Sequence, residues 1–151
     1  MKCHVGVDAG SGLVHTVTVT SANKHDITET VNLIREDDEV VYGDSGYLGV
    51  QKRSEIQQNE HFSKADFRIN RRPKSLPKVS DHAIDWERYI EHRKSSIRSK
   101  VEHVFRIIKC QFGYKKVVYR GLKKNENRLY ALFACANLYS LAIAGQKLST
   151  T

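Results

Sequence analysis

The chain has 151 residues, of which 40% are hydrophobic and 28% are charged. This composition fits one globular domain with a hydrophobic core and excludes a low-complexity chain. Lysine and arginine number 25 against 17 aspartate and glutamate residues, which gives a formal net charge of +8. Such a charge favours polyanionic partners, although basic charge by itself identifies none of them.

The three cysteines, Cys3, Cys110 and Cys135, form no CxxC pair and lack the spacing of a zinc site. They favour reduced thiols in a cytoplasmic protein. The N-terminus lacks the apolar run of a signal peptide. The apolar stretch at 129–144 is shorter than a bilayer span and contains Asn137, so the sequence predicts no membrane partner.

The first predicted element is a β-hairpin at residues 2–20. Its two arms alternate between apolar and polar residues, and the second arm is rich in β-branched side chains. The glycine-rich stretch 9–12 predicts the turn between them. Asp26 and Glu29 form a D-x-x-E capping box, which predicts a helix from there to about Arg35.

Residues 39–43 (EVVYG) predict a short buried strand that ends at Asp44 in a glycine-rich bend. Loops at strand ends are where α/β sheets place ligands. The polar and basic stretch at about 58–85 is predicted to be an exposed insertion, with one short strand near 67–69.

Two helices are predicted in the second half of the chain. The first runs from about Trp86 to Lys109, and helical spacing marks its buried stripe. The stripe consists of Ile97, Val101, Val104, Phe105 and Ile108. Residues 114–119 predict a short strand or an extended arm. The apolar stretch 125–144 predicts a long helix that ends at Gly145 and is buried between other elements.

Three charged residues share one edge of the first of these helices. At 100° per residue, with Arg98 as zero, Glu102 falls at about 40° and Lys109 at about 20°, while the apolar stripe centres near about −80°. Charges at the border of a buried face are costly unless they pair or hold a metal. The helix alone leaves open a solvated ion pair between Arg98 and Glu102.

Several stretches of the chain, taken in order, match the motifs of a single protein family. They are HVGVDAGSGLVHTV (4–17), TSANKHD (20–26), VVYGDSGYLG (40–49), SIRSKVEHVFRIIKCQFGYKKVVYRGL (96–122) and NENRLYALFACANLY (125–139). With the R-x3-E-x6-K spacing of Arg98, Glu102 and Lys109, nearly the whole chain resembles bacterial insertion-sequence transposases of the DDE type. That family often has a tyrosine three residues before the arginine. Ser95 stands there in this chain, and no role is assigned to it.

The resemblance implies an α/β fold with an RNase H-like core, in which a mixed sheet and helices gather three carboxylates around two divalent ions. Asp44 and Glu102 are then ligands of Mg²⁺ or Mn²⁺, while Arg98 and Lys109 position Glu102 and hold DNA phosphates. The implied activity is cleavage of transposon ends and their transfer to target DNA. Further DNA contacts are expected from Arg71, Arg72, Lys100, Arg106, Lys115, Lys116 and Arg120.

Asp8 is a candidate for the third metal-binding carboxylate, because it ends an apolar strand. In the resembled fold, however, three strands precede the first helix, and the first of them carries the aspartate. Only two predicted strands precede Asp26, so a turn position for Asp8 is favoured over a metal ligand. We therefore expect 1–151 to be a single, N-terminally truncated catalytic domain that lacks the first, central strand. Marginal stability and little or no transposition are expected of it.

Two other functions stay open. An RNase H-like nuclease that cuts without strand transfer would use the same residues. A non-catalytic nucleic-acid-binding remnant is the other alternative, because two carboxylates hold two Mg²⁺ ions poorly. The resemblance further implies DNA as the partner, a homo-oligomer in the full-length family, and a cytoplasmic, nucleoid-associated location.

Overall fold

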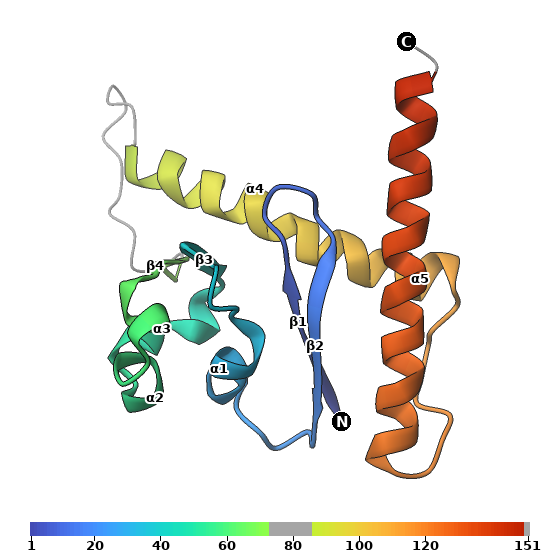
Figure 1. Ribbon diagram of the computed structural model, residues 1–151, viewed down its shortest axis with the longest axis horizontal. Coiled ribbons are helices and arrows are strands. Elements are labelled where there is room, and N and C mark those ends of the chain that lie inside the picture. Colours follow the sequence, from blue (N-terminus) through green and yellow to red (C-terminus); the bar gives the residue numbers. More distant parts are fainter. Residues whose placement is uncertain (73–85, 150–151) are drawn as a thin grey trace. The chain divides into compact units, whose positions relative to one another are not determined.

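The computed structural model describes residues 1–72 and 86–149, which divide into two compact units. Unit 1 consists of Met1–Lys24 and Lys100–Thr151, and unit 2 of His25–Ser99 (Figure 1). One helix, α4 (Trp86–Arg106), contributes residues to both units. The remainder of the predicted insertion, 73–85, lies outside the described residues.

A β-hairpin opens unit 1, as the alternating pattern predicts. β1 (Lys2–Val7) pairs antiparallel with β2 (Val14–Thr20). Asp8 shapes the turn, because its Oδ1 accepts a hydrogen bond from the main-chain N of Ser11 at 2.5 Å. A short acidic side chain that bonds the following backbone is typical of such turns.

A π-helical turn and a long helix complete unit 1. α4 continues into the π turn Ile107–Gln111, and α5 (Leu122–Ser149) follows after an irregular segment. The strand or arm predicted at 114–119 is irregular backbone. α5 begins three residues earlier than predicted and continues past Gly145, because a glycine inside a helix costs only about 1 kcal/mol.

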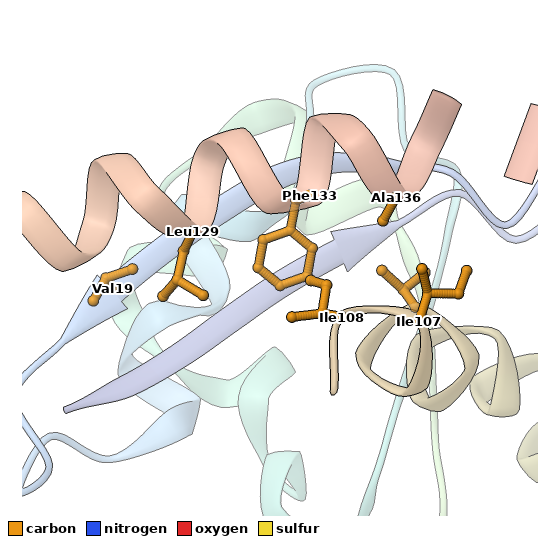
Figure 2. Packing of buried hydrophobic residues seen from close by; sticks show 7 residues of the cluster. Val19, Ile107, Ile108, Leu129, Phe133 and Ala136 are labelled. Carbon is orange, nitrogen blue, oxygen red and sulfur yellow. The ribbon is translucent and has the colours of Figure 1, made fainter. Parts of the chain in front are cut away.

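The core of unit 1 lies between one face of α5, the C-terminal part of α4 with its π turn, and the hairpin. Its buried members are Val19, Val104, Ile107, Ile108, Leu129, Phe133 and Ala136. Figure 2 shows Phe133 on α5 directed toward Ile108. The stripe predicted for the helix is confirmed at Val104 and Ile108. Burial of the adjacent Ile107 was not predicted and accompanies the change from α-helical to π-helical backbone.

The prediction that α5 is buried between other elements is wrong. Leu129, Phe133 and Ala136 lie on its one buried face, whereas Leu138 is 67% exposed and Leu141 is 52% exposed. Apolar residues occur on both faces of α5, so the sequence pattern does not reveal which face is covered.

The predicted length of the apolar stretch is also too short. Residues Leu122–Gln146 of α5 are long and apolar enough to cross a membrane by length and composition. One such helix is weak evidence for a membrane span, because a mostly buried core helix passes the same test, although only 17% of this span is buried. Here α5 supplies Leu129 and Phe133 to the core, and Asn137 binds β2 through both the N and the O of Val14.

Unit 2 contains a pair of parallel strands, β3 (Val40–Gly43) and β4 (Asp66–Ile69). Parallel strands require a crossover connection, and this one contains the short helices α2 (Ser54–Gln57) and α3 (Glu60–Lys64). The buried core of unit 2 consists of Ile34, Val50, Ile56, Phe62 and Ile69. The first part of the predicted insertion therefore contributes a helix, a strand and core residues.

The predicted capping box is wrong. Asp26–Glu29 forms a 3-10 turn whose N-cap is His25, and no side chain caps it. The α-helix that follows, α1 (Thr30–Leu33), is a single turn. The helix predicted from Asp26 is therefore present only as two short turns.

The mixed α/β composition agrees with the predicted fold class. The strands described within 1–72 and 86–149 form two two-stranded sheets, β1–β2 in unit 1 and β3–β4 in unit 2. A single five-stranded sheet of the RNase H type, and the absence of its first strand, stay predictions.

Candidate active site

Asp44 lies directly after β3, where the sequence predicts a ligand-binding carboxylate. Its Oδ1 accepts a hydrogen bond from the main-chain N of Gly46 at 2.8 Å and so caps the 3-10 turn Ser45–Tyr47. The side chain is 48% exposed. Asp44 is therefore held by the local backbone and accessible to a ligand.

Arg98 on α4 pairs with Asp44 within unit 2. The guanidinium Nη1 of Arg98 lies 3.6 Å from Oδ2 of Asp44. Both side chains are about a third or more exposed, so this ion pair adds little to stability. Its consequence is local, because it places a fixed positive charge beside the carboxylate. The structure thus brings together two of the predicted site residues.

The backbone that carries Asp44 is closely packed on both sides. A Cβ atom at Gly43 would lie 2.7 Å from Cδ1 of Ile69 and 3.4 Å from Cβ of Tyr47. Gly43 therefore allows β4 and the following turn to approach this strand end, which a larger residue would push apart.

Tyr47 is half-buried and lies near three carboxylates, of which Asp44 is one. Burial raises the pKa of Tyr47 to about 12, helped by the charges of Asp26, Asp44 and Glu29. The 3-10 turn Asp26–Glu29 packs beside the turn that contains Tyr47. Asp26 and Glu29 were predicted to form a capping box, and the sequence pattern gives no sign of their effect on Tyr47.

Glu102 and Lys109 belong to unit 1. Glu102 lies one helical turn after Arg98 and is exposed. The Nζ of Lys109 lies 5.9 Å from the ring centre of Phe105. The placement of the two units relative to each other is not determined, so the meeting of Asp44 with Glu102 stays a prediction.

The donor chemistry at Asp44 fits Mg²⁺ or Mn²⁺, because a partly exposed carboxylate is the hard oxygen ligand that these ions prefer. Across the part of the chain that the structure describes, no group of three or more His, Cys, Asp or Glu side chains could hold a metal. Asp44 is thus a suitable single ligand, to be completed by other groups.

A hollow of about 350 Å³ in unit 1 brings three predicted cations together. Lys109, Lys115 and Lys116 line it. Apolar parts of its wall come from Met1, Cys3, Phe105, Ile108, Tyr114, Val117, Leu129 and Phe133. Exposed lysines around an apolar floor are suited to phosphate contacts along a DNA backbone.

The other predicted DNA-binding residues are divided between the two units. Arg71 and Arg72 are exposed in unit 2, and Arg106 and Arg120 are exposed in unit 1. Lys100 differs, because its Nζ donates hydrogen bonds to the main-chain carbonyls of the hairpin turn at residues 9 and 10. Lys100 therefore stabilises that turn, and its contact with DNA stays a prediction.

Two sets of polar residues with structural contacts were not predicted from the sequence. Asn125 is 3% exposed and donates to the carbonyl oxygens of Tyr119 and Gly121, each at 2.6 Å, which ties the irregular segment to α5. A second set joins β4 to α4 in unit 2 through Asn70 and Glu91. No motif marks these residues, because the partners of Asn125 belong to irregular backbone and those of Asn70 are more than 20 residues away in the sequence.

Comparison with known proteins agrees with the motifs. The family model described as the transposase DDE domain matches residues 1–138. No solved structure matches the chain. The matched range includes Asp44, Arg98, Glu102 and Lys109, and it extends from β1 through more than half of α5.

Proposed function

We propose that this chain, which belongs to the transposase DDE domain family, cleaves the ends of a transposable element and transfers them to target DNA in a metal-dependent reaction. The observation that carries the proposal is the pairing of Asp44 with Arg98 at the end of β3, inside the matched range. Phosphoryl transfer on DNA requires a carboxylate for a divalent ion and a cation for the phosphate, and this pair supplies both chemistries.

Each residue of the site has a definite role in this proposal. Asp44 and Glu102 would hold Mg²⁺ or Mn²⁺, which activates the attacking oxygen and stabilises the leaving oxygen of a phosphodiester when bound. Arg98 orients the carboxylate of Asp44 and offers its guanidinium to a DNA phosphate. Lys109 and Lys115 bind the DNA backbone at the hollow in unit 1.

Metal-dependent nicking of DNA tests the proposal. Asp44→Asn and Glu102→Gln keep the size of each side chain and remove its charge, so nicking with Mg²⁺ or Mn²⁺ should fall to background in both variants. Asp66→Asn is the matched control, because Asp66 is 56% exposed and lies in the same unit as Asp44. Nicking that persists in both site variants would contradict the assignment.

Strand transfer separates a transposase from a nuclease. Pre-cut transposon ends, supplied with a target duplex and Mn²⁺, should be joined to the target by a transposase. A nuclease of the same fold would cut DNA but leave these ends unjoined.

A non-catalytic DNA-binding role is the second candidate. The lysines that line the hollow of unit 1 can bind phosphates without a metal ion, and this observation favours the second candidate. Salt-sensitive DNA binding that survives Asp44→Asn and Glu102→Gln, without any nicking by the wild-type chain, would support it.

We further propose that the protein acts on DNA in the bacterial cytoplasm, bound to the nucleoid, and that full-length members of the family act as homo-oligomers. Light scattering of the protein with transposon-end DNA should then give a mass of more than one copy per complex. A mass of one copy at all protein concentrations would contradict the oligomer.

A further inference from the structure

Asn70, the residue directly after β4, connects this strand to the strand that carries Asp44. The main-chain N of Asn70 donates to the carbonyl O of Gly43 at 2.9 Å. This bond extends the parallel pairing of β3 and β4 as far as the residue before Asp44. The position of Asp44 therefore depends in part on the position of Asn70.

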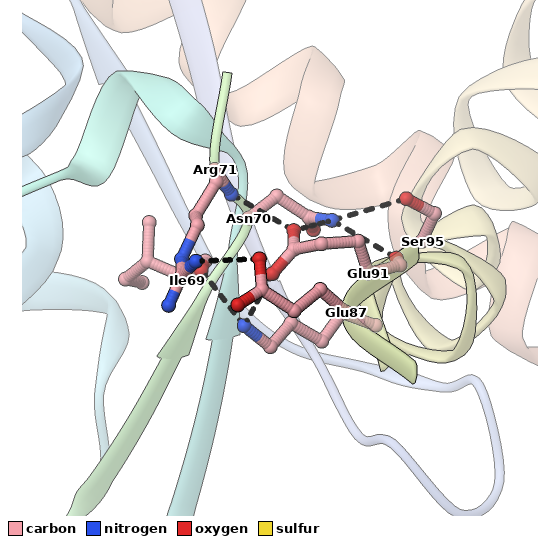
Figure 3. A network of polar contacts seen from close by, with 7 residues as sticks. Ile69, Asn70, Arg71, Glu87, Glu91 and Ser95 are labelled. Atoms are coloured by element: carbon pink, nitrogen blue, oxygen red, sulfur yellow. Dashed lines mark hydrogen bonds and ion pairs between the residues drawn. The ribbon is translucent and has the colours of Figure 1, made fainter. Parts of the chain in front are cut away.

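The side chain of Asn70 binds α4 (Figure 3). Its Nδ2 lies 3.2 Å from the carbonyl O of Glu91, 3.1 Å from Oε2 of Glu91 and 3.1 Å from Oγ of Ser95. Three acceptors thus share the two protons of one amide group. Ser95 lies three residues before Arg98, so Asn70 holds the turn of α4 that leads into Arg98.

Glu91 strengthens the same connection from the helix side. Its Oε2 also accepts from the main-chain N of Arg71 at 2.8 Å, and its Oε1 accepts from Nζ of Lys94 at 2.8 Å. Lys94 in turn donates to the carbonyl O of Ile69 at 3.2 Å. Only 11% of the Glu91 side chain is exposed. Burial raises the pKa of Glu91, but the bonds from Lys94, Arg71 and Asn70 outweigh it and lower the pKa below its ordinary value.

We propose that Asn70 and Glu91 are positioning residues, which hold α4 against the end of β4 so that Arg98 stays beside Asp44. This inference rests on the proposed function. A buried, hydrogen-bonded carboxylate is costly to break apart, because removing one partner leaves the others unsatisfied. By contrast, the neighbouring pair of Arg71 and Glu87, at 3.2 Å, is more than half exposed on both sides and contributes little.

The proposal predicts a large effect on rate and only a small one on DNA affinity, because Arg98 is one of several proposed phosphate contacts. A displacement of about 1 Å in a reacting group can slow a reaction by about 100-fold. Asn70 and Glu91 lie in unit 2, whereas the lysines of the hollow lie in unit 1, so the DNA contacts proposed there are untouched by their substitution.

The first measurement follows Arg98 directly by NMR. The Nε–H signal of its guanidinium, assigned with Arg98→Lys, should move in Asn70→Ala and in Glu91→Ala. Glu91→Gln should retain it in large part, because an amide oxygen still accepts from the backbone of Arg71. Glu87→Ala is the matched control: the residue lies one turn earlier on α4 and is exposed, so the Arg98 signal should stay in place.

The second measurement is single-turnover nicking with Mn²⁺. Asn70→Ala and Glu91→Ala should slow it by about 10- to 100-fold, with the Kd for DNA changed by less than about twofold. Glu91→Gln should recover most of the rate. A merely structural role would lower the amount of folded protein but would not separate rate from affinity in this way.

The two measurements distinguish failure of the inference from failure of the function. An Arg98 signal that is unchanged in Asn70→Ala and Glu91→Ala overturns the inference, even when Asp44→Asn abolishes nicking. If no variant or wild-type sample nicks DNA, the function fails, and the NMR result still decides whether these residues position Arg98. If the alanine variants do not fold, Ser95→Ala replaces them. It removes one contact of Asn70 and should shift the Arg98 signal, and an unchanged signal would again overturn the inference.

Discussion

At the scale of single residues, charge and burial act together on Tyr47. The side chain follows Asp44 by three residues and is half-buried. Loss of its phenolic proton would create a negative charge out of water and beside three carboxylates, which is why its pKa is raised. The same charges favour the approach of a cation, so Tyr47 reports on the electrostatics of the proposed site.

The Tyr47→Phe variant should show this effect in alkaline solution. The tyrosinate absorbance of the wild-type chain minus that of Tyr47→Phe should have a midpoint near 12, against 10.0 for an ordinary tyrosine. A folded pKa above the unfolded one gives stability that is complete below pH 10 and is lost as pH rises toward 12. In urea unfolding, the wild-type chain should therefore lose more stability than Tyr47→Phe across that window. A difference midpoint near 10 would contradict the buried, acidic surroundings.

At the scale of elements, α4 and α5 differ in how well the distribution of apolar residues along the helix predicts which face is buried. The amphipathic stripe correctly predicts the burial of Val104 in α4 and of Ile108 in the π turn, because polar residues occupy the opposite face, but it does not predict the burial of Glu91. α5 is apolar on both faces, yet its contacts with the π turn and the hairpin cover one face only. Its stability in unit 1 therefore depends on a few large residues.

Paired substitutions on α5 test this difference between its faces. Phe133 is 2% exposed and packs edge-to-face on Phe105 at 5.7 Å between ring centres. Phe133→Ala should lower the free energy of unfolding by about 3–5 kcal/mol, because it leaves a cavity in the core. Leu138→Ala, at a position that is 67% exposed, should change it by less than about 0.5 kcal/mol. Equal losses in urea denaturation would show that the exposed face is covered in solution.

At the scale of the whole molecule, the effect of the net charge of +8 on DNA binding depends on where the cationic side chains lie. Lys109, Lys115 and Lys116 gather at one hollow of unit 1, whereas Lys100 is engaged with the hairpin turn. DNA binding through released counterions depends on the number of phosphates contacted, not on the total charge. A few lysines should therefore account for much of the salt dependence.

Two double variants that remove the same charge can show whether the salt dependence of DNA binding comes from particular lysines or from the net charge. Lys115→Ala with Lys116→Ala should reduce the slope of log K against log salt by about 2, which corresponds to two lost phosphate contacts. Lys52→Ala with Lys64→Ala removes the same charge from exposed positions in unit 2 and should leave the slope nearly unchanged. Equal effects of the two double variants on duplex binding would mean that net charge alone sets the affinity.

Local patterns in the sequence were enough to predict several helices and strands, and to place Asp44 at the end of one of these strands. Alternation predicted the hairpin, helical spacing predicted most of α4, and a short apolar run predicted that Asp44 ends a strand. The R-x3-E-x6-K spacing and neighbouring motifs predicted the family, which the match over 1–138 confirms. These features depend on residues within one or two turns of each other, where the backbone period determines which side chains share a face.

Only the tertiary structure decided the contacts between distant segments. The single buried face of α5, the burial of Ile107 in a π turn, and the effect of Asp26 on Tyr47 all depend on what packs nearby. So does the bond between Asn70 and Glu91, which are 21 residues apart. Hydrogen bonds and desolvation act over a few ångströms in space, and a sequence specifies such distances only after the chain has folded.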